Sequence, residues 1–178
     1  SSSSTLSFVN GSSDVVLDDT YKEYLFTFKD IHAENDTSHF SFQANAAGGS
    51  GYNETITSTM FRAQHGEDGN NSQLNYDDND YDLAQATGFQ KLNQNLGNGA
   101  DECLTGYLHL FNPSSTTFVK HYMSRISNTN GGGSSTYMCD CHSAGYFNTT
   151  SAIDEIQFKM SSGNIDSGTI KLYGIKGS

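Results

Sequence analysis

The chain has 178 residues, with 20 acidic and nine basic side chains and a formal net charge of −11. This length suits one domain with its own hydrophobic core, and the lack of clustered cations excludes a nucleic-acid partner. No stretch approaches the roughly 20 consecutive apolar residues of a membrane-spanning helix. The N-terminal sequence SSSSTLSFVN has no charged region followed by an apolar run, so we expect no secretory signal.

Apolar and polar residues alternate with a period of two along most of the chain, which is typical of half-buried β-strands. LSFV and VVL are short candidates within residues 1–20, which we expect to form an N-terminal arm with the first short strands. In the next segment Tyr24, Phe26 and Phe28 share one face. The same alternation recurs, in chain order, at Phe40 and Phe42; Ile56 and Met60; Leu108 and Leu110; Phe118, Lys120 and Tyr122; Tyr137, Cys139 and Cys141; Ile156, Phe158 and Met160; Ile170 and Leu172.

Turn clusters rich in Gly, Ser, Thr and Asn separate these short strands, a pattern that predicts an all-β protein. About eight to ten strands is the number found in jelly rolls. We therefore predict a single jelly-roll-like antiparallel β-sandwich over residues 21–178, with no amphipathic helix. The last strand, with Ile170 and Leu172 toward the core, is expected to pair centrally and to follow its predecessor through a hairpin-like connection over SSGNIDSG.

Residues 64–101 interrupt the pattern as one long polar region. We expect two partial strands, around 83–84 and 88–92, and otherwise a large exposed loop inserted into the domain. Sugar-binding sites combine aromatic faces with Asn and Asp side chains, and loops on a rigid scaffold often carry binding residues. The candidate ligand-binding residues of this loop are Tyr76, Asp78, Asn79, Asp80, Tyr81, Asp82 and Phe89.

Two short motifs raise the question of a metal. The acidic run YDDNDYD offers carboxylates to a calcium ion, but counting from Asp78 puts Leu83 and Phe89 where an EF-hand needs Gly and Glu. A solvated acidic loop is the favoured interpretation. The CDCH motif, residues 139–142, lacks a second ligand pair for zinc, and buried thiols explain it. We predict neither a metal nor a cofactor, and three cysteines, an odd number, predict free thiols.

No catalytic arrangement is visible at the level of the sequence. A nucleophile elbow of the Gly-x-Ser-x-Gly type is absent. The adjacent acids Asp101–Glu102 and Asp154–Glu155 would point to opposite faces of a strand and so cannot form a glycosidase pair. The sequence therefore predicts a protein that is not an enzyme.

Three segments carry a family resemblance: YKEYLFTFKDI (21–31), LTGYLHLFNPSS (104–115) and AIDEIQFKMSSGNIDSGTIKLYGIK (152–176). They resemble a group of bacteriophage virion surface proteins associated with tail fibres and head decoration. The resemblance extends from about Tyr21 to Lys176, with residues 64–101 matching poorly, and its most specific piece is the C-terminal SGN…SGTIKLYG motif. It implies a jelly-roll sandwich assembled in the host cytoplasm into a virion, in contact with other virion proteins, as a homo-oligomer that is by analogy a trimer.

The sequence thus predicts a non-enzymatic structural component of a bacteriophage virion surface, either a tail-fibre or tail-accessory protein or a head decoration protein. Its loops would serve attachment to the host surface, where a glycan is the expected ligand. The alternative is a carbohydrate-binding module or adhesin domain of a non-viral protein.

Overall fold

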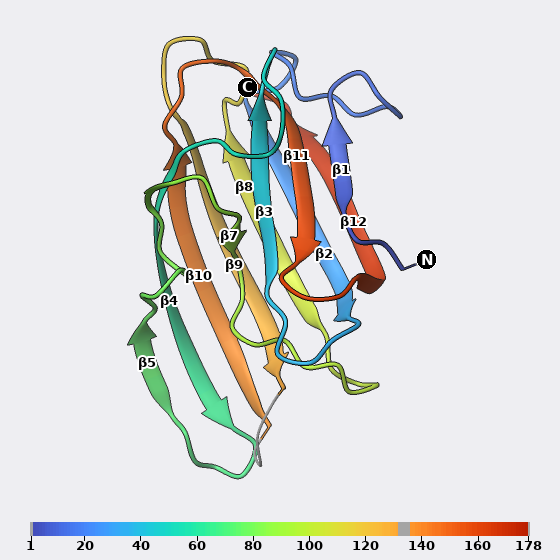
Figure 1. The fold of residues 1–178 in the computed structure, drawn as a ribbon, viewed down its shortest axis with the longest axis vertical. Helices are drawn as coiled ribbons and strands as arrows, with labels where there is room; N and C mark the ends of the chain where they lie inside the picture. Colours follow the sequence, from blue (N-terminus) through green and yellow to red (C-terminus); the bar gives the residue numbers. More distant parts are fainter. Residues whose placement is uncertain (1, 132–135, 178) are drawn as a thin grey trace.

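A computed structural model describes residues 2–131 and 136–177 of the chain. Its strands are β1 (Leu6–Val9), β2 (Glu23–Ala33), β3 (Phe40–Ala46), β4 (Ile56–Gly66), β5 (Gln73–Tyr76), β6 (Ala84–Ala86), β7 (Gln90–Lys91), β8 (Leu104–Phe111), β9 (Lys120–Asn130), β10 (Tyr137–Phe147), β11 (Ile153–Met160) and β12 (Ile165–Ile175). They form two antiparallel sheets packed as a β-sandwich, which confirms the predicted fold class (Figure 1). Within the described ranges no helix is long and apolar enough to cross a membrane.

The two sheets differ in size. The smaller has the order β1-β11-β3-β7 and lies in front of the larger in Figure 1. The larger has the order β12-β2-β8-β9-β10-β4-β5, with β6 also paired to β4. The pairs β2–β12, β3–β11 and β4–β10 are nested along the chain and alternate between the sheets. A long hairpin rolled into two layers has this pairing, as in jelly rolls.

The core lies between the sheets and is dominated by phenylalanines. The ring centroid of Phe158 lies 5.3 Å from those of Phe26 and Phe28, and 5.5 Å from that of Phe40. Almost every residue predicted to face the core is buried, because the period of two places alternate side chains on one face of each strand. Phe118 precedes β9 and is exposed, and Tyr137, Ile170 and Leu172 are only half-buried.

The C-terminal strand departs from the prediction in two ways. β12 is the edge strand of the larger sheet, not a central one, and its Leu172 is only half-buried. The turn before it is not a hairpin, because β11 and β12 belong to different sheets and the chain crosses between layers there. Periodicity reports which face of a strand is buried but not its neighbours. Gly174 does allow a close approach, since a Cβ atom there would lie 2.2 Å from the Tyr21 ring.

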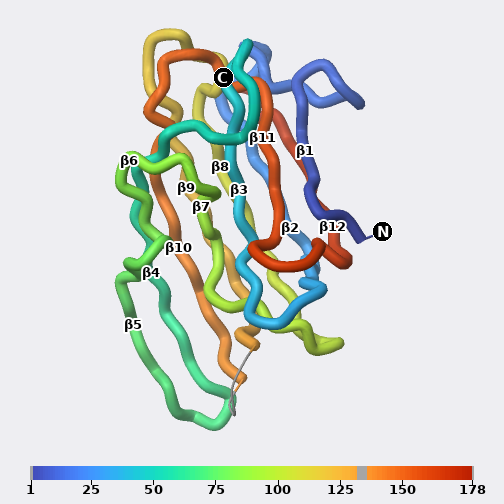
Figure 2. The backbone as a smooth tube through the Cα atoms, in the orientation of Figure 1, coloured from blue at the N-terminus to red at the C-terminus, as the bar shows by residue number. Residues whose placement is uncertain are grey.

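Residues 64–101 are not the large exposed loop that the sequence predicts. β4 continues to Gly66, β5 pairs with it, and β6 and β7 lie near the two partial strands expected. We call residues 77–101 the closing segment. It leaves the edge strand β5 and runs to β7, which pairs with β3 at the edge of the smaller sheet (Figure 2). Its Leu83, Leu92 and Leu96 are buried, so the closing segment covers the core between the two sheet edges.

Candidate functional site

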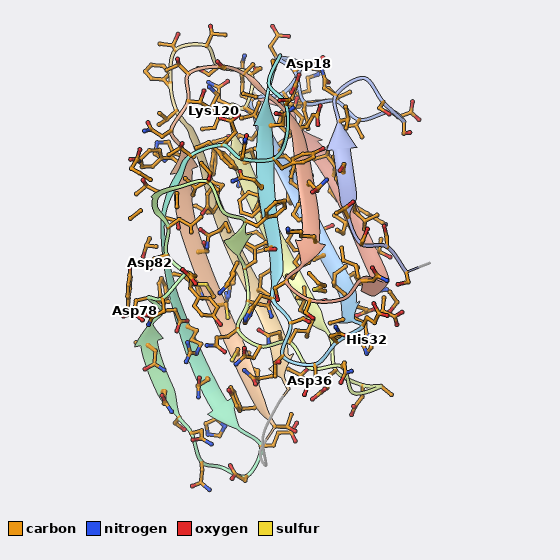
Figure 3. The ribbon with its side chains drawn as sticks, viewed as in Figure 1. Asp18, His32, Asp36, Asp78, Asp82 and Lys120 are labelled. Carbon is orange, nitrogen blue, oxygen red and sulfur yellow. The ribbon has the colours of Figure 1, made fainter. Side chains whose placement is uncertain are left out.

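The seven candidate residues of the polar region do not form one site. Tyr76 lies on β5, and its hydroxyl donates a hydrogen bond to an Asp82 carboxylate oxygen at 2.8 Å. Figure 3 shows Asp78 and Asp82 beside β5 at the margin of the molecule. Tyr81, in contrast, packs against the core between the sheets. Phe89 lies further along the closing segment, where the ammonium of Lys159 sits 4.0 Å from its ring centre.

Tyr81 has a structural environment. Its ring packs edge-on against the imidazole of His39 with 5.3 Å between centroids, and the Lys91 ammonium lies 4.5 Å from the ring centre. Burial raises the pKa of Tyr81 to about 12. The half-buried ring of Tyr81 thus anchors the closing segment to the sandwich.

The acidic run is a turn beside a buried ion pair. Asn79 and Asp80 both have positive φ, 56° and 75°, a conformation that Asn and Asp tolerate in tight turns. Asp77, which the sequence did not single out, is buried and pairs with the guanidinium of Arg62 on the inner side of β4. Among residues 2–131 and 136–177 no group of three or more His, Cys, Asp or Glu side chains could hold a metal ion.

A different surface gathers the exposed apolar side chains. The outer face of the larger sheet is the side that points away from the smaller sheet. By register and exposure it carries eight of the ten exposed large hydrophobic side chains of the described residues. They are Phe61, Leu74, Tyr76, Tyr107, Met123, Met138, Tyr173 and Ile175. Exposed apolar side chains gathered on one face are typical of interaction sites on soluble proteins.

One row of side chains crosses the middle of the outer face. The strand register places Tyr76, Phe61, His142, Arg125 and Tyr107 opposite one another across β5, β4, β10, β9 and β8. The rings of Phe61 and His142 are stacked, with centroids 4.8 Å apart and planes 5° from parallel. Cross-strand neighbours that stack in this way hold each other in place, so the row is ordered before any partner binds.

A bidentate ion pair lies beside this row. Arg125 donates from Nε and from one terminal nitrogen to the two Asp140 oxygens at 2.9 and 2.8 Å, and His142 Nε2 lies 3.3 Å from the same carboxylate. The hydrogen bonds from Arg125 hold the pKa of Asp140 below its ordinary value of 3.8. Each charge is thereby compensated within the chain.

The outer face is close to neutral although the chain is strongly acidic. On the four central strands, β4, β8, β9 and β10, the only Lys, Arg, Asp or Glu side chains at outward positions are Arg125 and Asp140. The formal charge of −11 is therefore carried by the remainder of the surface. Depletion of charge together with exposed aromatic residues and Met is the composition of protein interface cores.

Shallow hollows lie between the exposed side chains. One of about 370 Å³ is lined by Thr57, His121 and Tyr146 with their neighbours. A second hollow, of about 220 Å³, is lined by Phe61, Tyr107 and Met123. Tyr107 also borders a third hollow, of about 260 Å³, and so separates it from the second. Ridges and hollows thus alternate across the face.

Sequence reasoning missed the outer face, although a signal was present. The alternation in GYLHLF places Tyr107, His109 and Phe111 on the side opposite Leu108 and Leu110. On a sheet with one solvated side that side should be polar. Apolar residues on both faces of one strand therefore indicate that the face away from the core also contacts a partner.

Comparison with models of protein families, with curated proteins and with solved structures gives no match. The resemblance to bacteriophage virion proteins accordingly stays a prediction, and the function is argued from the geometry of the outer face.

Proposed function

We propose that the chain is a non-enzymatic structural component of a bacteriophage virion surface, a tail-fibre, tail-accessory or head decoration protein. In this proposal the outer face of the larger sheet docks onto protein in the assembled particle. The closing segment and neighbouring loops remain on the exposed side, available for attachment to the host surface. The family resemblance of the sequence motifs supports the assignment to a virion, and the exposed apolar side chains of the outer face support its role in docking.

One observation carries the proposal: a sheet face that exposes Phe, Tyr and Met and whose central strands β4, β8, β9 and β10 carry only one outward ion pair, on a chain of net charge −11. Burying such a face removes apolar area from water at about 25 cal/mol per Å². Particle proteins meet many copies of one another through surfaces of this type, because particles are built from symmetric repeats.

The test is the protein composition of purified bacteriophage particles from the source of the chain. We expect an antibody raised against the chain to label intact particles in electron micrographs, at a regular position on the head or the tail. Reconstruction of the labelled part should show the outer face covered by protein. Particles that lack the chain altogether would overturn the proposal.

A carbohydrate-binding module is the second candidate, and one observation favours it. Tyr107 borders hollows that also include Arg125 and Asp140, so aromatic rings and polar groups lie together as sugar sites require. A glycan array with the purified chain separates the two functions. Selective micromolar binding that Tyr107→Ala abolishes supports recognition of a glycan, whereas no binding to any glycan supports the architectural role.

A further inference from the structure

We propose that the partner of the outer face is a second copy of the same chain, placed by a two-fold axis so that two larger sheets pack face to face. The inference rests on the proposed docking role of this face and names its occupant. It replaces the trimer expected by analogy with a symmetric dimer.

The charge distribution favours a second copy over an oppositely charged partner. In a two-fold contact the same surface meets itself, so any net charge on the surface would face the same sign. The central outer face meets this condition, because Arg125 and Asp140 neutralise each other and the remaining outward residues of β4, β8, β9 and β10 are not Lys, Arg, Asp or Glu. A face built for a basic or an acidic partner would carry an excess of the opposite sign.

The acidic residues on the rest of the surface also favour contact through the outer face. Two chains of formal charge −11 repel each other wherever their carboxylates approach. The acidic run lies beside β5 at the margin of the larger sheet, where an Asp82 carboxylate oxygen accepts a hydrogen bond from the Tyr76 hydroxyl. Face-to-face contact of the larger sheets therefore brings the two copies together where the repulsion is smallest.

The shape of the face also suits contact with itself. Isologous packing requires that one surface supply both the projecting side chains and the hollows that receive them. Met123 is 57% exposed at the centre of the face, on β9. Hollows of about 220 and 370 Å³ lie directly beside it, the first bordered by Phe61 and Tyr107 and the second by Tyr146. Each copy can thus insert its Met123 beside that of the other.

The area is sufficient for a stable dimer. The strands β4, β9 and β10 have 11 residues each and β8 has eight. Four strands about 4.8 Å apart, with a rise of about 3.4 Å per residue, cover roughly 700 Å². The outward side chains of β2 and β12, which include Tyr173 together with the charged Glu23, Lys29 and Lys171, extend this to about 1,000 Å². A standard specific interface buries about 800 Å² on each partner.

The experiment measures the mass of the full chain in solution by sedimentation velocity between about 1 and 100 µM. We expect a dimer, at twice the 19.3 kDa of one chain. Met123→Glu and Met123→Lys, each made separately, should raise the dimer Kd at least tenfold, because two like charges then face each other near the axis. The control is Phe118→Glu, which alters an exposed apolar side chain outside the sheet.

Mixing the Met123→Glu and Met123→Lys chains tests directly whether the two Met123 positions face each other. If the face packs on its own copy, the Glu and Lys chains attract each other and the heterodimer forms again. A wild-type chain that stays monomeric at 100 µM, a trimer, a dimer that Met123→Glu leaves intact, or a mixture without rescue each overturns the inference. If the chain is a monomer in solution but the antibody labels virus particles, the dimer is ruled out and the proposed function stands. If the chain is a dimer but is found in no particle, the dimer stands and the proposed function is ruled out.

Discussion

The strands of the sandwich and the closing segment are held in place by different forces. Between the sheets, phenyl rings pack against one another, with Phe158 at the centre. The closing segment has few ladder hydrogen bonds of its own, and buried side-chain amides bind it to the sheets instead. Gln43 Nε2 alone donates to the carbonyls of Thr87 and Gly88, at 3.2 and 3.0 Å, and to that of Glu54.

Two amides of the closing segment hold it internally and bind it to β3. Gln90 Nε2 donates to the carbonyls of Tyr81 and Lys91 at 2.7 and 2.8 Å, and the Asn93 side-chain oxygen accepts from the backbone N–H of Phe40. Apolar packing tolerates small changes of shape, whereas a buried amide must meet its partners with correct geometry. The comparison predicts that the two regions fail differently when one side chain is changed.

The largest effect is expected at the centre of the core. Phe158→Ala removes a fully buried ring that contacts the rings of Phe26, Phe28 and Phe40. We expect the free energy of unfolding to fall by about 3–5 kcal/mol, measured by urea denaturation. Phe118→Ala, at an exposed ring, is the control and should change it by less than about 0.5 kcal/mol. Similar losses at both positions would contradict the placement of Phe158.

A change in the amide network should cost less and act locally. Gln43→Leu keeps an apolar stem but leaves the carbonyls of Thr87 and Gly88 without their donor, so we expect a loss of about 1–3 kcal/mol. Hydrogen exchange should accelerate in the closing segment before it does in β9 and β10. Gln157→Leu, at an exposed amide bonded to Ser7, is the matched control. Uniform acceleration across all strands would show that the segment does not open separately.

These two regions also differ in what the sequence could predict. Alternation located the core strands and correctly placed Cys139 and Cys141 on one buried face. It failed in the closing segment, where Asn93 is buried because it bonds to Phe40 of the distant strand β3, and Gln90 because it bonds to the Tyr81 carbonyl within the segment. Polar residues of this kind are predicted as loop from composition. Their hydrogen-bond partners are set by the tertiary fold and cannot be identified from a single sequence. The edge position of β12 was missed for the same reason, since register with β2 is a tertiary property.

The outer face lies between these two cases. Its residues follow the alternation, which predicts the correct side of the sheet for them but no role. Alternation alone places Met123 and His142 on the solvent side of their strands, whereas the acidic run, which supplies most of the candidate ligand-binding residues, forms an ordinary turn. Pattern therefore located the docking face without distinguishing it from a solvated one.

Acid should loosen the contact between the closing segment and β3 through His39. Burial, with a contribution from the nearby Lys91 charge, lowers the pKa of His39 from 6.5 to about 4. Between these two values the unfolded chain binds a proton that the folded chain does not, so stability falls as the pH drops from about 6.5 to about 4. Allowing for partial exposure, we expect His39 to contribute about 1–2 kcal/mol of this fall.

The measurement is the free energy of unfolding at a series of pH values for the wild type and for His39→Asn. Asn can still accept the hydrogen bond that the imidazole takes from the backbone N–H of Asn95. The variant should therefore show a shallower decline in this window and the same stability as the wild type above about pH 7. Parallel curves for the two proteins would rule out a contribution from His39.

The smallest effect on stability is expected on the outer face. Arg125 and Asp140 form an exposed, bidentate cross-strand pair, and such pairs contribute about 0.2–1 kcal/mol in double-mutant cycles. The cycle made from Arg125→Gln, Asp140→Asn and the double variant should give a coupling in this range near pH 7. Because the pKa of Asp140 is lowered in the folded chain, the coupling persists through neutral pH and is lost only as the pH falls through that lowered value, below 3.8. A weak coupling would show that the outer face, unlike the core, contributes little to folding. Its exposed aromatic side chains and its ion pair are then explained by contact with a partner in an assembly. A coupling of several kcal/mol would instead make the face a second stabilising layer of the sandwich and remove the argument for a partner.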